Sequence, residues 1–143
     1  MTMTLVGTFV DVVDKPNNNG RIYSKEIWES EIARLKEHLE AGDLYGTSDK
    51  DYFDADYTVK IGEVSHIVTD LKVVGSDLTA NIEILDTPRG KLLQEMFDQH
   101  KDKIRWAPMG VGSCVVGDQG AVVQGDYHMT AVCWWLDSGE ENS

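Results

Sequence analysis

The strictest pattern in the sequence is the alternation of apolar and polar residues between positions 77 and 85. The apolar positions are Leu78, Ala80, Ile82 and Ile84, and the polar positions between them are Thr79, Asn81 and Glu83. Successive side chains of a strand point to opposite faces of a sheet, so this period of two predicts a strand with one buried face. The turn-forming residues around Gly75 join this segment to an apolar stretch at 61–74. We therefore expect a β-hairpin formed by 61–74 and 77–85.

Two segments carry helical patterns instead. Over 25–41, the large apolar residues fall on one face of a helix. They are Trp28, Ile32, Leu35 and Leu39. Ser24 suits the N-cap of this helix and Gly42 suits its end. A second helix is expected to begin at Thr87 and Pro88, because threonine favours the cap and proline the first helical position.

Most of the remaining chain predicts strands. The segments rich in β-branched and aromatic residues are 3–14, 104–116, 120–125 and 127–136. The segments 15–20 and 43–60 are expected to be loops. Many strands interrupted by two helices favour an α+β, mainly β fold. We expect a β-barrel or a strongly curled antiparallel sheet with two or more helices packed outside it.

Length and charge limit the possible functions. A chain of 143 residues suits one domain, 1–143, with a short polar C-terminal tail at 137–143. The sequence has 25 acidic and 13 basic residues, a net charge of −12. An acidic surface repels phosphate backbones, so nucleic acid is not an expected partner. No membrane span or secretion signal is recognisable, and the expected setting is a cytosol.

Neither the cysteines nor the acidic clusters indicate a metal site. Cys114 and Cys133 lack metal-ligand spacing, and cytosolic proteins rarely keep disulfides, so both are expected to be buried free thiols. One acidic cluster consists of Asp49, Asp51, Asp54 and Asp56. It lacks the glycine at the sixth position and the terminal glutamate of an EF-hand loop, which favours solvated surface. We expect no metal and no cofactor.

Five short motifs occur in a recognisable order. They are Asn19–Tyr23, Gly46, Val64–Val68, Ile84–Gly90 and Met109–Ser113. In this order and at this spacing they resemble the prohead core proteases of contractile-tailed phages. The resemblance covers about residues 17–136. It implies a fold similar to the herpesvirus maturational protease, a β-barrel wrapped by helices, which agrees with the predicted elements.

The residues that carry catalysis in that family are replaced here. The family's general-base histidine, in a loop of the form Gly-Glu-Leu-Xaa-His-Pro, is matched by Lys50, which is expected to be a charged and poor base. The family's Ser-Ser-Arg-Gly-Xaa-Gly, which carries the nucleophile, is matched by 107–112, beginning with Ala107 and Pro108. Serine acylation needs a hydroxyl and a base of matched pKa. Ala107 and Pro108 supply no nucleophile, and Pro108 has no N–H for an oxyanion hole. We therefore expect no catalytic residues.

An active enzyme is the main alternative. A divergent serine or cysteine protease would use Ser113 or Cys114 with His66. This alternative requires the glycine-rich segment to be shifted by several residues relative to the family's motif. The simpler interpretation is a packed strand histidine at His66 and a turn serine at Ser113. Ser48 and Lys50 have the residue types of a serine–lysine dyad, but both lie in an acidic loop and are expected to face solvent.

Several aromatic residues are candidates for a docking surface. Adjacent residues of a strand face opposite sides, so one of Trp134 and Trp135 is expected in the core and the other at the surface. With Trp106, Tyr52 and Phe53, the exposed tryptophan is expected to contribute to binding a partner.

The favoured hypothesis is a catalytically inactive, prohead-protease-like phage structural protein. It would bind the phage major capsid protein or another head protein, as a decoration, cement or head-assembly protein. We expect it in the virion or in the host cytoplasm during assembly, and a homo-oligomer is a further candidate assembly. The third hypothesis is a phage-encoded binder of a host protein.

Overall fold

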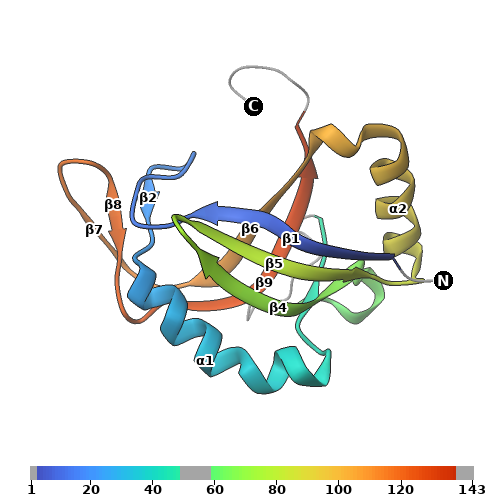
Figure 1. Cartoon of the computed structure of the whole chain (residues 1–143), viewed down its shortest axis with the longest axis horizontal. Coiled ribbons are helices and arrows are strands. Elements are labelled where there is room, and N and C mark those ends of the chain that lie inside the picture. Colours follow the sequence, from blue (N-terminus) through green and yellow to red (C-terminus); the bar gives the residue numbers. More distant parts are fainter. Residues whose placement is uncertain (1–2, 49–58, 138–143) are drawn as a thin grey trace.

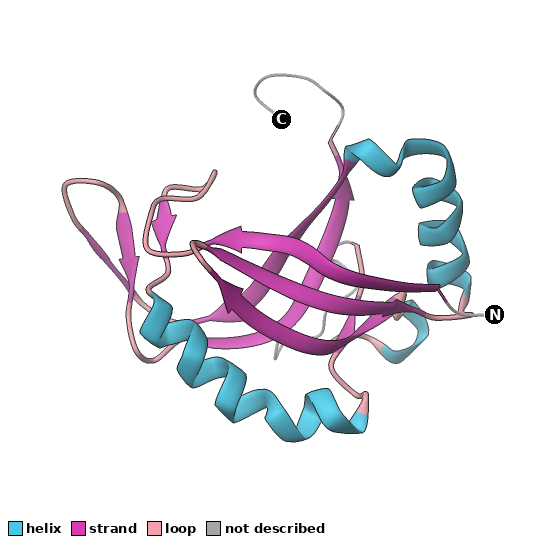
Figure 2. Ribbon diagram, viewed as in Figure 1, coloured by secondary structure: helices cyan, strands magenta, loops and turns pink. Residues whose placement is uncertain are grey.

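The computed structural model describes residues 3–48 and 59–137 of the chain. Its elements are, in chain order, β1 (Met3–Val12), β2 (Arg21–Ile22), α1 (Lys25–Ala41), β3 (Tyr45–Gly46), the 3-10 helix η2 (Ile61–Glu63), β4 (His66–Val74), β5 (Asp77–Ile84), α2 (Pro88–His100), the 3-10 helix η3 (Lys101–Lys103), β6 (Ile104–Val111), β7 (Cys114–Val116), β8 (Ala121–Val123) and β9 (His128–Leu136). The expected α+β, mainly β fold is confirmed: a strongly curled antiparallel sheet carries α1 and α2 on its outside (Figures 1 and 2).

The strands form a partly closed barrel. One antiparallel sheet has the order β1-β5-β4-β3, and β6 pairs with β9 in a second. The N–H of Trp134 in β9 donates to the carbonyl of Thr47, just after β3, across 3.3 Å, and this bond joins the two sheets. On the opposite side β1 lies beside β6 without a hydrogen-bonded ladder. A small sheet of order β2-β8-β7 extends from one end (Figure 1).

The predicted hairpin is the centre of the main sheet. In β5 the side chains of Leu78, Ala80, Ile82 and Ile84 are buried, as the alternation predicts. β4 pairs with β5 from His66 opposite Ile84 to Val74 opposite Asp77. The hairpin is shorter than expected at its start, because 61–63 form the 3-10 helix η2 and the strand begins only at His66.

Helix α1 begins and ends at the expected residues. The Ser24 hydroxyl oxygen accepts from the N–H of Ile27, and Gly42 ends the helix with a positive φ of 72°. Trp28, Leu35 and Leu39 are buried as predicted. In α2 the Thr87 hydroxyl accepts from the N–H of Gly90, again the expected cap.

The buried face of α1 also contains a carboxylate. Glu31 is only 3% exposed and accepts hydrogen bonds from the Arg34 guanidinium and from the backbone N–H of Met129 at the start of β9. His128 Nδ1 lies 3.2 Å from the same carboxyl group. These bonds hold the pKa of Glu31 below its usual range against the opposing effect of burial. Glu31 therefore fastens α1 to β9 as a satisfied buried charge.

Two expectations about the C-terminal strands are wrong. The predicted strand 104–116 is two strands, β6 and β7, which belong to different sheets. They separate at Gly112 and Ser113, where a Cβ at position 112 would come within 2.7 Å of the Tyr127 backbone. Because β7 lies in the small outer sheet, Cys114 is exposed rather than buried, whereas Cys133 is half-buried in β9. Both thiols are free.

Within the described residues, no helix is both long and apolar enough to cross a membrane.

Candidate functional site

The positions that the motif order predicts to match the nucleophile of prohead proteases, Ala107 and Pro108, lie in the middle of β6. Ala107 pairs with Cys133 of β9, and Pro108 pairs with Val132. The side chains at these two positions of β6 are therefore a methyl group and a pyrrolidine ring. Neither group can attack a carbonyl or donate a hydrogen bond. Lys50, which matches the family's histidine, lies outside the described residues, as do Tyr52, Phe53 and the acidic positions 49, 51, 54 and 56, and so does the expected tail beyond Asp137.

Cys133 is the thiol nearest in the strand register to Ala107. Burial raises the pKa of the Cys133 thiol to about 12, although a hydrogen bond from the backbone of Thr47 acts in the opposite direction. The nucleophilic species is the thiolate, and a thiol with this pKa is almost entirely protonated near neutral pH. Cys133 therefore does not provide a reactive thiol at this position of the barrel.

His66 is buried beside this part of β6 and β9. Its ring packs edge-on against Trp106, with centroids 5.0 Å apart, and its exposed fraction is 0%. His66 Nε2 lies 2.7 Å from the carbonyl oxygen of Val132, and Nδ1 lies 2.7 Å from the Ser65 hydroxyl. The indole N–H of Trp134 donates to the same hydroxyl across 3.3 Å.

The partners of His66 determine its protonation. A carbonyl oxygen only accepts, so Nε2 carries the proton and donates to Val132, while Nδ1 accepts from Ser65. Burial lowers the pKa of His66 to about 4, so the ring is neutral near pH 7. Ser65 and His66 thus make a serine–histidine contact, but both residues are 0% exposed. A substrate carbonyl cannot reach this hydroxyl, and the pair holds β4 against β9.

The structure does not bring His66 together with the two alternative nucleophiles. Both ring nitrogens of His66 already have partners, and Ser113 and Cys114 lie beyond the end of β6, at the base of the small outer sheet. The Ser113 hydroxyl and backbone N–H both donate to Asp126, each across 3.0 Å. These bonds lower the pKa of Asp126, which makes its carboxylate a weak base. The geometry thus provides no activated hydroxyl at Ser113.

The structure describes three of the five residues expected at an aromatic docking surface, namely Trp106, Trp134 and Trp135. Trp134 is buried and Trp135 is 43% exposed, which confirms the prediction that the two adjacent tryptophans divide between core and surface. The contribution of Trp106 to a docking surface stays a prediction, because Trp106 belongs to the lining of the groove described below although its side chain is mostly buried. Its side chain is 7% exposed and packs on His66, because its position in β6 points into the barrel.

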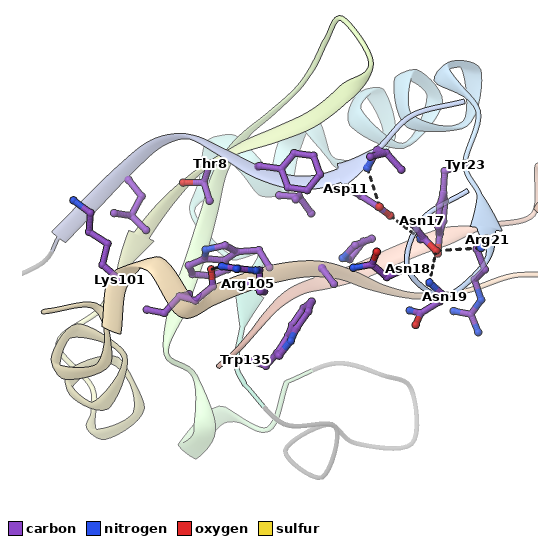
Figure 3. Close-up of a pocket in the computed structure, with 18 of the residues that line it drawn as sticks. Thr8, Asp11, Asn17, Asn18, Asn19, Arg21, Tyr23, Lys101, Arg105 and Trp135 are labelled. Atoms are coloured by element: carbon purple, nitrogen blue, oxygen red, sulfur yellow. Dashed lines mark hydrogen bonds between the residues drawn. The ribbon is translucent and has the colours of Figure 1, made fainter. Parts of the chain in front are cut away.

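A groove that the sequence did not indicate lies along the open seam between β1 and β6 (Figure 3). Its volume is about 1080 Å³. Its walls are β1, the 16–19 turn and the first half of β6, with Trp135 of β9 at its border. Segments about 100 residues apart in the chain form it, so no local motif could reveal it. In the described part of the chain, no group of three or more histidine, cysteine or acidic residues is placed to bind a metal ion.

Comparison with known proteins shows a similarity of fold at low sequence identity. No protein-family model matches the sequence, and no curated protein matches it. The structure of the capsid assembly protease of bacteriophage T4, gp21, superposes on this chain with a TM-score of 0.72. The match covers 94% of this chain and 96% of that chain, at 16% sequence identity. The chain therefore has the fold of a phage capsid assembly protease, as the order of its motifs predicted.

Proposed function

We propose that this protein is a phage head protein that binds another head protein without cleaving it. The likeness of its fold to a capsid assembly protease supports the phage-head setting. The nature of the residues along β6 supports the absence of cleavage. The favoured partner is the major capsid protein, and the role is decoration, cementing or assembly of the head.

The single observation that carries the proposal is the chemistry at the centre of β6. Ala107 and Pro108, which the motif order matches to the family's nucleophile, have no nucleophilic atom in their side chains, and Cys133, which pairs with Ala107, has a strongly raised pKa. The nearby imidazole of His66 is sealed in the core and already bonded on both nitrogens. A general base must reach the proton that it removes, and this one reaches no exposed hydroxyl or thiol in the described part of the chain.

Binding does not need those lost groups. A phage head repeats the same protein surface many times, so a modest affinity at each site is sufficient when several sites are engaged together. The groove between β1 and β6 and the exposed side chain of Trp135 are available to contact such a partner.

The test measures binding and cleavage in the same mixture. The purified protein is incubated with the capsid and other head proteins of the phage that encodes it, and with assembled heads. We expect it to sediment with the heads, while intact-mass spectrometry shows no new termini. A catalytically active head-maturation protease acting on the same substrates is the positive control.

Specific cleavage would overturn the proposal, provided that it comes from this chain. Ser113→Ala and Cys114→Ser provide that check, because both side chains are exposed and neither lies in the core. Cleavage that either substitution abolishes would establish the divergent protease. Recovery of bacterial proteins in place of head proteins would support a binder of a host protein instead.

A further inference from the structure

The groove along the open seam of the barrel has two unusual walls. β1 pairs with β5 on one side only, β6 pairs with β9 on one side only, and the groove separates their other edges. Figure 3 shows the two strands running along its opposite sides, with Thr8 on β1 and Arg105 on β6. An unpaired edge ordinarily invites another strand to add to the sheet.

Both edges are poorly suited to a long backbone ladder. Pro108 in β6 has no N–H to donate. β1 has irregular register with β5 between Leu5 and Thr8 and again between Phe9 and Asp11, and such bulges disturb the edge. Recognition in this groove must therefore depend mainly on side chains.

The groove offers apolar contact area that is exposed in the free chain. Val6, Phe9 and Trp135 line it and are 78%, 49% and 43% exposed. Exposed aromatic residues beside a groove are typical anchors for a bound partner. β1 lines the groove from Thr4 to Val12, which corresponds to about eight or nine residues of an extended segment.

The charge of the groove is opposite to that of the chain. Its basic lining residues are Arg21, Lys101 and Arg105, and its acidic lining residue is Asp11. Lys101 lies at one end and Arg21 at the other (Figure 3). Arg105 is held in place by bonds to the carbonyls of Asp102 and Ile104 and by an ion pair with Asp137.

The acidic residue in the groove is already engaged. Asp11 is 6% exposed and accepts from the side chain of Asn17 and from the N–H of Val12. Asn17 in turn accepts from the N–H groups of Asn19 and Arg21, which fixes the turn at this end of the groove. On a protein with a net charge of −12, the groove therefore presents basic groups at both ends and exposed apolar side chains within a mixed polar and apolar lining.

We propose that this groove binds an extended acidic segment of the partner protein, with carboxylates at its ends and apolar side chains between them. This inference rests on the proposed function for the identity of the partner, but its chemistry comes from the groove alone. The chain's own net charge of −12 opposes a second copy and also a nucleic acid, which is a far denser polyanion than a short peptide.

The first experiment uses three nine-residue peptides labelled with fluorescein. The acidic peptide is Glu-Asp-Val-Thr-Phe-Thr-Val-Asp-Glu. In the second peptide lysine replaces the four acidic residues, and in the third serine replaces valine and phenylalanine. Fluorescence anisotropy at low salt should show the acidic peptide binding about tenfold or more tightly than either control, because both charge and apolar contact are required. The same assay with labelled oligothymidylate tests the nucleic-acid alternative.

Substitutions in the groove and outside it locate the site. Lys101→Glu reverses an exposed charge in the groove, and Lys36→Glu makes the same change on the exposed face of α1. Trp135→Ala removes the exposed aromatic side chain, and Tyr45→Ala removes one that is 40% exposed outside the groove. We expect about fivefold or greater weakening from Lys101→Glu and from Trp135→Ala, and less than twofold from the two controls. Circular dichroism verifies the fold of every variant.

The outcomes separate this inference from the proposed function. Equal binding of the three peptides, preferential binding of the oligothymidylate, or self-association that occupies the groove would overturn the acidic-segment inference. Head binding that survives Lys101→Glu and Trp135→Ala would also overturn it, while leaving the proposed function intact. If the protein bound the acidic peptide but did not bind heads, the proposed function would be overturned while the acidic specificity of the groove would stand.

Discussion

At the scale of single residues, burial shows that the serine–histidine contact in this protein is structural and not catalytic. Ser65 and His66 are in hydrogen-bond contact, as a nucleophile and its base would be, but both are sealed in the core. Sequence patterns could place His66 in a strand. They could not identify its bond to Val132, which lies 66 positions away and reaches His66 only through the pairing of sheets.

The buried, neutral state of His66 predicts a specific loss of stability in acid. Its pKa is about 4 in the folded protein, against about 6.5 in an unfolded chain. The unfolded state therefore binds more protons in this range, and the contribution of His66 to stability declines as the pH falls from about 6.5 to about 4. The difference corresponds to about 3 kcal/mol. Urea unfolding at pH 7.5, 6, 5 and 4 measures it.

His66→Gln isolates this contribution, because the other titrating groups remain in the variant. We expect the wild type to lose more unfolding free energy between pH 7.5 and 4 than His66→Gln does. His100→Gln, which removes an exposed histidine from the end of α2, should follow the wild-type curve. Identical pH dependence of wild type and His66→Gln would contradict the assigned burial and protonation of His66.

At the scale of elements, the locally encoded parts could be predicted and the parts made by distant pairing could not. The face of α1, its caps and the alternation of β5 depend on residues within a few positions of one another. The two-residue strand β3 depends instead on β4, and the burial of Glu31 depends on Met129 of β9. Nothing in the local sequence around either feature indicates these partners.

The junction at β3 leaves no room for a side chain at Gly46. A Cβ there would lie 2.2 Å from His66 Nε2 and 2.3 Å from the Val132 carbonyl oxygen, which are the two atoms of a buried hydrogen bond. Gly46→Ala should therefore separate β3 from β9 and lower the unfolding free energy by about 2–4 kcal/mol. Urea denaturation at neutral pH measures the loss.

Gly62→Ala is the matched control, because a Cβ at that position meets no atom within 4 Å. Its effect should stay within about 0.5 kcal/mol. If the two alanine variants were equally stable, the close approach of β3, β4 and β9 at Gly46 would not exist in solution.

At the scale of the whole molecule, a β-barrel with helices on its outside could be expected from the family resemblance, but the open seam could not. The groove exists because β1 and β6 lie side by side without pairing, and its charge arises from Arg21, Lys101 and Arg105 on separate elements. The net charge of −12 by itself predicts that the protein repels acidic partners, whereas the basic groups of the groove attract them. Only the assembled barrel shows a basic groove on an acidic protein.

The assembled structure also predicts an uneven distribution of stability. β5 is paired on both sides and buries Ile82 and Ile84 completely, whereas β7 is a three-residue edge strand in which Val115 and Val116 are 59% and 85% exposed. Opening β7 exposes little further apolar surface, so this edge strand should open locally while the barrel stays folded. Hydrogen exchange followed by NMR should show amides of β7 exchanging at least about a hundredfold faster than those of β5. Equal rates with the same dependence on denaturant would show instead that β7 and the barrel unfold as one cooperative unit.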